Sequence, residues 1–235
     1  MALYAIADLH LPLGVDKPMD IFGSEWDNYV DRLKENWQNT VKPEDTVVLP
    51  GDFSWATYLS ESQADFEFLN SLNGIKILLK GNHDYWWTTK NKLDTFIQEK
   101  QYHNIHFLQN NSYLYKGKAI CGTRGWIFPG WDGFSADDAK IYAREVQRLE
   151  LSLKDAQKNN PVEKIVFTHY PPISKNCMEN EFTRMMKQYG VTQCVYGHLH
   201  AASHKNAVQG SIHGIEYILV SGDYRQFEPF CLIEN

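Results

Sequence analysis

Five short polar blocks contain the residues of this chain that could do chemistry, and most of them follow a hydrophobic segment. The blocks are Asp8-Leu9-His10, Gly51-Asp52, Gly81-Asn82-His83-Asp84, His169 within Thr-His-Tyr-Pro-Pro, and Gly197-His198-Leu199-His200. Every block contains Asp, Asn or His, whose oxygen and imidazole nitrogen atoms are ligands of borderline divalent metals. Together the blocks predict a metal site.

The spacing within the blocks indicates how they could share two metal ions. Asp8 and His10 are two residues apart at an expected strand end, so both side chains can face one ion. Asp52 follows a glycine that allows close approach of the backbone, and its two oxygens could bridge two ions about 3.5 to 4 Å apart. A shared hydroxide between such ions would attack phosphorus in line with the leaving oxygen. The remaining ligands would be Asn82, His169 and His198 on the second ion and His200 on the first.

Alternating strand-like and helix-like segments must position these blocks. The segments predicted as strands are 3–7, 46–49, 75–79, 105–108, 119–121, 164–168, 194–196 and 217–220. Apolar residues at three- and four-residue steps predict helices at 24–40, 60–72, 88–100, 136–158 and 179–189. This alternation predicts an α/β fold, in which ligands collect where the strands end. The polar blocks lie at those ends.

The length and composition predict one domain over residues 1–235. A chain of 235 residues with 43% hydrophobic residues can bury one sizeable core. No internal repeat or low-complexity segment is visible. The Gly- and Trp-rich stretch 122–133 is interpreted as a loop, and the amphipathic helix after it is expected to pack on the core.

The charge pattern excludes some classes of partner. The formal net charge is -6 and no long run of Lys or Arg occurs, which argues against binding to nucleic acid but not against a small phosphorylated substrate or a phosphoprotein. Four cysteines lie far apart without a CxxC pair, which favours reduced thiols in a cytoplasm. No segment resembles a signal peptide or a membrane span, so we expect no membrane association.

The five blocks, in this order, resemble those of the calcineurin-like metallophosphoesterases. The family pattern is DxH, GDx, GNHD or GNHE, a lone His, and GHxH, and the chain has all five between residues 8 and 200. Each block is weak alone, but the ordered combination is specific. The resemblance implies a four-layer αββα sandwich of two mixed β-sheets flanked by helices, with the active site at the strand ends.

The resemblance also implies roles for individual residues. Two divalent ions (Mn, Fe or Zn) would be held, one by Asp8, His10, Asp52 and His200 and the other by Asp52, Asn82, His169 and His198. His83 would contact the phosphate or protonate the leaving group, with Asp84 orienting its ring. The segments that differ from well-known members, and that we expect to decide the substrate, are Phe53-Ser54-Trp55, Tyr85-Trp86-Trp87 and the 122–126 loop.

Residues outside the blocks have more ordinary interpretations. Arg124, in a Gly-flanked loop, suits either contact with phosphate or a surface ion pair. With Asn82 and His83 it forms the predicted substrate-binding set. Packing is favoured over base stacking for Trp86, Trp87, Trp126 and Trp131. Surface or packing roles are expected for His103, His106, His204 and His213.

The leading hypothesis is a dinuclear-metal phosphoester hydrolase, a phosphomonoesterase or phosphodiesterase, that uses a metal-bridging hydroxide. The alternative is a metal-binding, catalytically weak protein-interaction scaffold of the same fold, against which the intact His83-Asp84 pair counts. A nuclease is a third interpretation, and the absence of a basic patch argues against it. The oligomeric state, the metal and the substrate are not indicated by the sequence.

Overall fold

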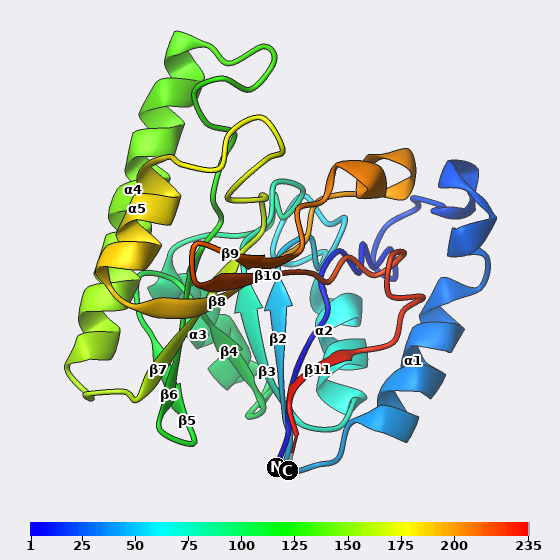
Figure 1. Cartoon of the computed structure of the whole chain (residues 1–235). Coiled ribbons are helices and arrows are strands. Elements are labelled where there is room, and N and C mark those ends of the chain that lie inside the picture. Colours follow the sequence, from blue (N-terminus) through cyan, green and yellow to red (C-terminus); the bar gives the residue numbers. More distant parts are fainter. Residues whose placement is uncertain (235) are drawn as a thin grey trace. The chain divides into compact units, whose positions relative to one another are not determined.

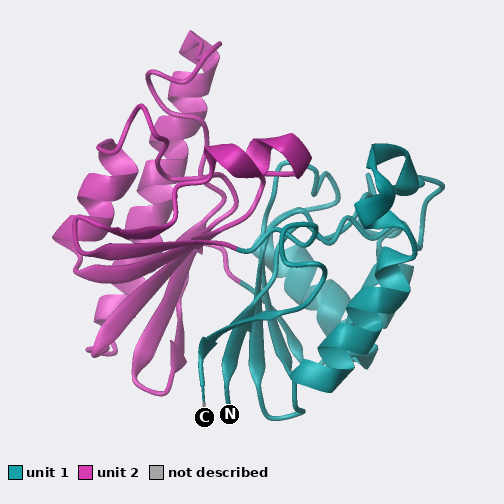
Figure 2. Ribbon diagram, turned by 45° about the vertical axis from the view of Figure 1, so that its right-hand side comes forward, with its two compact units in different colours: residues 1–107, 220–235 teal, residues 108–219 magenta. Residues whose placement is uncertain are grey.

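The computed structural model describes residues 1–234 and divides the chain into two compact units (Figure 2). Unit 1 contains residues 1–107 together with the segment from Val220 onwards, and unit 2 contains Leu108–Leu219. The chain therefore leaves unit 1 after one long segment, builds unit 2, and returns. The prediction of a single domain over residues 1–235 stays a prediction.

Unit 1 is built on a five-stranded mixed sheet with the order β11-β1-β2-β3-β4 (Figure 1). Neighbours among the first four strands in the chain run parallel, and β11 pairs antiparallel with β1. Because parallel strands end at the same edge, the loops after β1, β2 and β3 meet there. The strands are β1 (Leu3–Ala5), β2 (Thr46–Pro50), β3 (Ile75–Leu79), β4 (Ile105–Phe107) and β11 (Phe230–Ile233).

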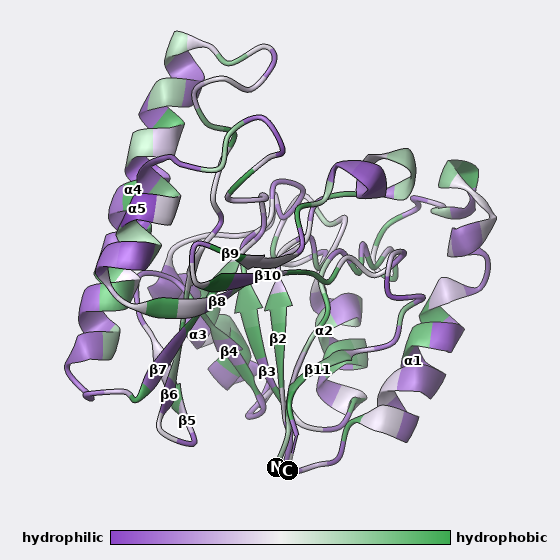
Figure 3. Ribbon diagram, viewed as in Figure 1, coloured by the Kyte–Doolittle hydropathy of each residue, from purple (hydrophilic) through white to green (hydrophobic). Residues whose placement is uncertain are grey.

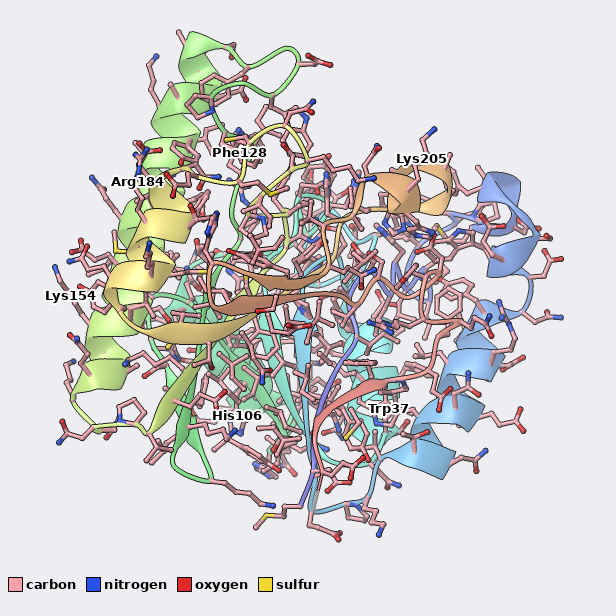
Figure 4. The ribbon with its side chains drawn as sticks, viewed as in Figure 1. Trp37, His106, Phe128, Lys154, Arg184 and Lys205 are labelled. Carbon is pink, nitrogen blue, oxygen red and sulfur yellow. The ribbon has the colours of Figure 1, made fainter. Side chains whose placement is uncertain are left out.

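The helices of unit 1 gather on one side of its sheet in Figure 2. They are α1 (Tyr29–Thr40), α2 (Gln63–Ser71) and α3 (Lys90–Glu99). Their apolar sides face the strands, and the hydropathy colouring of Figure 3 shows green strands beside helices with purple outer surfaces. Trp37 of α1, labelled in Figure 4, is fully buried and its indole N–H donates to the Asn73 carbonyl at 2.9 Å. The core also contains Leu33, Phe66, Leu69, Leu93, Val47 and Leu78.

The predicted helix 24–40 is interrupted near its start. Short 3₁₀ turns cover Asp20–Phe22 (η1) and Ser24–Trp26 (η2), and α1 begins only at Tyr29. Asn28 has a φ of 48°, in the left-handed region, which a continuous right-handed helix cannot contain. The periodic pattern therefore predicted the buried face of the helix correctly, but it placed the start of the helix at residue 24 instead of Tyr29.

Unit 2 is built on a six-stranded mixed sheet with the order β5-β6-β7-β8-β10-β9. The inner strands β6, β7, β8 and β10 pair in parallel, and the two edge strands pair antiparallel. The strands are β5 (Tyr113–Tyr115), β6 (Lys118–Thr123), β7 (Glu163–Thr168), β8 (Val191–Tyr196), β9 (Gly210–Ile212) and β10 (Ile215–Leu219).

The helices of unit 2 are α4 (Ala136–Gln157) and α5 (Glu181–Gln188), with a 3₁₀ segment η3 at Ala201–Asn206. Each α-helix starts with a capping box, Ser135 with Asp138 and Asn180 with Thr183, which satisfies exposed N–H groups of the first turn. Leu149 and Leu153 of α4 are fully buried, which confirms that this helix packs on a core. Lys154 and Arg184 lie on α4 and α5 and are labelled in Figure 4.

The predicted α/β fold with two mixed sheets flanked by helices is confirmed. All eight predicted strands occur, with ends shifted by a few residues. The prediction missed β5, β9 and β11. The turn Lys116-Gly117, with φ values of 46° and 79°, joins β5 to β6. The turn His213-Gly214, with φ values of 52° and 82°, joins β9 to β10. Two positive φ values are typical of a tight hairpin turn, so a residue followed by Gly between apolar segments was an available signal.

Stretch 122–133 is partly as predicted. Residues 122 and 123 still belong to β6, and the rest of the stretch forms no helix or strand. Across the described residues 1–234, no helix has the length and apolar character needed to cross a membrane.

Lys76 on β3 is a fully buried cation, which is an unusual feature of this core. Its ammonium donates to the carbonyls of Leu72 and Gly74 at 2.6 and 2.9 Å, just beyond the end of α2. Burial lowers the pKa of Lys76 to about 7, because the charged form loses its hydration. The folded protein therefore binds fewer protons than the unfolded chain between about pH 7 and 10.

We predict that the free energy of unfolding rises between pH 7 and 10, by roughly 3 to 5 kcal/mol from this group. The gain follows because the unfolded chain still holds the Lys76 proton that the folded protein has lost. Urea unfolding at several pH values would measure it, and Lys76→Met should flatten the curve in this window. Lys92→Met, at an exposed position of α3, is the control and should retain the rise. An unchanged slope in Lys76→Met would contradict the assignment.

Candidate metal centre

Two loops of unit 1 that carry predicted ligands are joined by backbone hydrogen bonds. Asp8 N–H donates to the Gly51 carbonyl at 2.9 Å, and His10 N–H donates to the Asp52 carbonyl at 2.9 Å. The loop after β1 therefore runs beside the loop after β2. This pairing brings the side chains of Asp8, His10 and Asp52 to one edge of the sheet.

The three side chains form a compact and buried group. A ligand atom of Asp8 lies within 4.8 Å of one of His10, and Asp8 and Asp52 are related in the same way. His10 Nε2 lies 3.7 Å from Asp52 Oδ2, and none of the three residues is more than 3% exposed. Two buried carboxylates at this separation repel each other unless a cation lies beside them. The donor set of two carboxylates and an imidazole fits a divalent metal ion.

Backbone strain is concentrated at the same residues. Asp8, His10 and Asp52 have φ values of 60°, 44° and 54°, in the left-handed region. Each such non-glycine residue costs on the order of 1 kcal/mol or more, and the surrounding hydrogen bonds must hold it. In unit 2, His198 has a φ of 73°. Four predicted ligands therefore have a conformation that the chain adopts at a cost in stability.

The Asp84 carboxylate holds the ligand loops of unit 1 in place. It is fully buried and accepts N–H groups from Gly81 at 2.7 Å, Asp52 at 2.9 Å and Phe53 at 2.9 Å. The indole N–H of Trp86 donates to it at 3.0 Å. These contacts position the backbone on both sides of Asp52. The predicted role of Asp84 in orienting His83 stays a prediction beside this backbone role.

His83 and Asn82 lie half-buried in the loop after β3. The backbone N–H of His83 donates to Asp52 Oδ1 at 2.7 Å, which ties this loop to the predicted bridging carboxylate. The His83 ring lies with its centroid 5.5 Å from that of His10. The structure therefore brings the predicted proton donor of unit 1 next to a predicted metal ligand.

Unit 2 brings two predicted ligands together at the ends of neighbouring parallel strands. His169 and His198 follow the adjacent parallel strands β7 and β8, which pair Thr168 with Tyr196. His198 Nδ1 lies 3.2 Å from His169 Nε2, and His169 is fully buried. Two imidazole nitrogens at this distance can face one cation. His200, half-buried, is the N-cap residue directly before η3, and its N–H donates to the Ser203 hydroxyl at 2.7 Å.

Arg124 is held by other groups of unit 2. Its guanidinium pairs with the fully buried Glu145 at 3.3 Å and lies 4.5 Å from the Trp126 ring centroid. Burial lowers the pKa of Arg124, and the Glu145 carboxylate opposes that change. The backbone carbonyl of Arg124 accepts the N–H groups of His169 and Tyr170 at 3.0 Å each. An ion pair is present, but with a buried carboxylate rather than at the surface as expected, and contact with phosphate stays a prediction.

Asp65 supports the site and was not found from the sequence. This fully buried residue of α2 accepts the Leu13 N–H at 2.8 Å and the Ser54 hydroxyl at 2.5 Å. Leu13 and Ser54 belong to the loops that carry His10 and Asp52. No motif marks Asp65, because an acidic residue in the first helical turn ordinarily faces solvent.

All four tryptophans for which packing was predicted contact a hydrophobic core. Trp86 is 2% exposed within the core of unit 1, and Trp87 packs against that core. Trp126 and Trp131 pack against the core of unit 2. His106 is half-buried, and burial lowers its pKa.

Comparison with known proteins defines the class. The profile of the Calcineurin-like phosphoesterase family matches residues 1–202, which include every predicted metal ligand. The chain belongs to this family of metallophosphoesterases. A comparison with curated proteins gave no match.

Solved structures support the fold over the whole chain. A phosphopantetheinyl hydrolase from Mycobacterium tuberculosis is 14% identical with a TM-score of 0.59, covering 100% of this chain and 96% of that one. A Thermus thermophilus protein is 13% identical with a TM-score of 0.58, covering 98% and 97%. A protein of unknown function from Aquifex aeolicus is 19% identical with a TM-score of 0.51, covering 98% and 95%. At these identities the likeness concerns the fold alone.

We predict that Asp65 makes metal-free protein less stable as the pH rises from about 4 to 7. Burial raises the pKa of Asp65 to about 7, so the folded protein holds a proton that the unfolded chain releases near pH 4. The stabilisation that the protonated Asp65 gives the folded protein is therefore fully present below about pH 4 and lost above about pH 7, a change in the free energy of unfolding of roughly 2 to 4 kcal/mol. Chemical unfolding should show Asp65→Asn without this slope, and Glu67→Gln, exposed on the same helix, with it.

We predict that Gly81→Ala displaces Asp52. A Cβ atom at position 81 would lie 2.1 Å from Asp52 Oδ1 and 2.3 Å from its backbone N, so the ligand loop must move. Calorimetric titration with Mn²⁺ should show at least about tenfold weaker binding, the loss typical when support of a ligand is removed. Gly190→Ala is the control, because its left-handed φ is strained but its added Cβ meets nothing within 4 Å. Unaltered Mn²⁺ affinity in Gly81→Ala would contradict the role of Asp52 as a ligand.

Proposed function

We propose that this protein hydrolyses phosphoesters with two divalent metal ions. The observation that carries the proposal is the buried group of Asp8, His10 and Asp52, held in strained backbone conformations, in a member of the metallophosphoesterase family. Strain and buried like charges are both costly to the folded chain. A binding site for cations gives a reason for retaining both.

We assign seven ligands to the two ions. Asp52 would contribute to both ions, because a carboxylate has two oxygens. The first ion would add Asp8, His10 and His200, and the second would add Asn82, His169 and His198. When bound, such a pair supplies Lewis-acid chemistry, since it withdraws charge from phosphoryl oxygens and makes water a better nucleophile. Mn, Fe and Zn all suit these donors.

The side chains around the metals would then carry the remaining steps. His83, half-buried with its backbone N–H on Asp52, would protonate the leaving oxygen. Asp84 would maintain the geometry of both loops through its backbone contacts. Arg124 is kept as a candidate phosphate contact, although its pair with Glu145 would have to loosen.

The substrate is left open between a phosphomonoester and a phosphodiester, and between a small molecule and a phosphoprotein. Nucleic acid is disfavoured by the net charge of -6. A cytoplasmic location also stays a prediction, supported by the thiols of Cys121 and Cys194, which are buried and form no disulfide.

The deciding experiment strips the protein of metal and adds back Mn, Zn, Fe, Co or Mg separately. Hydrolysis of p-nitrophenyl phosphate and bis-p-nitrophenyl phosphate is then followed, with metal content measured on the same samples. We expect turnover with at least one metal and a preference for one ester. Metal uptake without hydrolysis of either ester would favour the catalytically weak interaction scaffold instead.

His83→Ala tests the proton donor. We expect kcat to fall by about 10² to 10⁴ while the bound metal content is retained, because a general acid contributes on that order. His103→Ala, an exposed histidine of the same unit, serves as control. Unchanged turnover in His83→Ala would remove this residue from the mechanism.

A further inference from the structure

Two aromatic rings flank the His83 imidazole. The ring centroid of Trp55 lies 4.6 Å away with an interplanar angle of 59°, and that of Tyr85 lies 6.2 Å away at 90°. Both residues belong to unit 1 and follow predicted functional blocks, Gly51-Asp52 and Gly81–Asp84. The surroundings of His83 are therefore apolar and flat on two sides.

Trp55 is held in one orientation by its own neighbours. Its ring stacks on His10 with a centroid distance of 4.6 Å and an angle of 27°. Its indole N–H donates to the Met19 sulfur at 2.8 Å, and the Lys17 ammonium lies 3.7 Å from the ring centroid. Because His10 and Lys17 lie over the faces of the ring, a ligand would meet the edge of Trp55, and a side chain fixed in this way binds with little further loss of conformational freedom.

Tyr85 differs from the other aromatic residues of these segments in its exposure. Phe53 and Trp86 are 1% and 2% exposed and belong to the core, whereas Tyr85 is 63% exposed. Its backbone N–H donates to the His83 carbonyl at 2.8 Å, so it is fixed to the loop that carries His83. Packing therefore explains Phe53 and Trp86 but leaves most of the Tyr85 ring accessible to a ligand.

We propose that Trp55 and Tyr85 form the binding site for the leaving group, and that the preferred substrates are phosphoesters whose leaving alcohol carries a planar apolar group. This inference rests on the proposed function. The group attached to the leaving oxygen must lie near His83, because His83 gives that oxygen its proton. The exposed Tyr85 ring favours a flat apolar group by stacking, and the edge of Trp55 helps to remove that group from water.

The step itself is an ordinary hydrolysis. The oxygen of water bonds to phosphorus while the bond from phosphorus to the leaving oxygen breaks. The leaving oxygen keeps the bonding electron pair and takes the proton from His83. The attacking water releases a proton to solvent, and His83 regains one from solvent. The net products are the alcohol and the phosphate, without any oxidation or reduction.

The test compares benzyl and ethyl esters of phosphate, or of methyl phosphate if diesters are preferred. Benzyl and ethyl alcohol have similar basicity, so the esters differ mainly in the planar group. For the metal-loaded protein, we expect kcat/KM to favour the benzyl ester by about tenfold, the magnitude of one aromatic stacking contact. Tyr85→Ala and Trp55→Leu should each reduce the ratio several-fold, and Tyr85→Phe, which keeps the ring, should retain it.

Tyr224→Ala is the matched control. Tyr224 is a partly exposed tyrosine of the same unit, but it lines a separate cavity with Arg225 and Phe230. We expect it to keep the wild-type ratio. Tyr85 is exposed, so its variants remain informative even if Trp55→Leu fails to fold.

The outcomes separate this inference from the proposed function. Hydrolysis of both esters at equal kcat/KM, or a benzyl preference that survives in Tyr85→Ala and Trp55→Leu, would overturn the leaving-group site while leaving the hydrolase intact. Hydrolysis of neither ester, nor of the two nitrophenyl esters, by metal-loaded protein would overturn both.

Discussion

The buried Asp84 carboxylate is the constraint on which the arrangement of unit 1 depends. It accepts N–H groups from Gly81, from Asp52 and from the residue after Asp52, so one side chain fixes two loops from different strands. A buried carboxylate is costly unless its oxygens are satisfied, and these donors satisfy it. Separating the loops would take these N–H donors away from the Asp84 carboxylate, which is unfavourable for a buried charge. The relative position of Asp52 and His83 is therefore determined by an acceptor that is itself shielded from solvent.

The same edge of the sheet combines rigidity with strain. Parallel β1, β2 and β3 end together, which gives the loops fixed starting points. Beyond them the backbone enters left-handed conformations at Asp8, His10 and Asp52, where a right-handed or extended residue would direct its side chain elsewhere. Hydrogen bonds between the loops, together with Asp65 behind them, compensate for that strain. The fold thus determines the positions of the ligands, and the local strain determines their directions.

The sequence predicted much of this structure because the signals were local. Hydrophobic segments located the inner strands, and the polar blocks located Asp8, His10 and Asp52, which the structure brings together. The edge strands β5 and β9 were missed because three residues carry little periodic signal, whereas the apolar strand β11 (Phe230–Ile233) was an available signal that the prediction did not use. The backbone role of Asp84 and the support from Asp65 were missed for another reason. Both depend on which distant N–H group a buried carboxylate meets, and no spacing rule contains that information.

Unit 1 is assembled from two ends of the chain. Strand β11 completes its sheet beside β1, and Ala7, directly before Asp8, exchanges backbone hydrogen bonds with Val220 and Gly222. During synthesis on the ribosome, residues 108–219 emerge as one uninterrupted segment, whereas the first 107 residues must wait for their final partner strand. The Asp8 loop can pair with residues 51–53 early, but its contacts on the Ala7 side form only when the late segment has emerged from the exit tunnel. This order couples a ligand-bearing loop to the synthesis of a segment more than 200 residues further along the chain, so a chain stalled before residue 220 lacks the contacts of Ala7 with Val220 and Gly222.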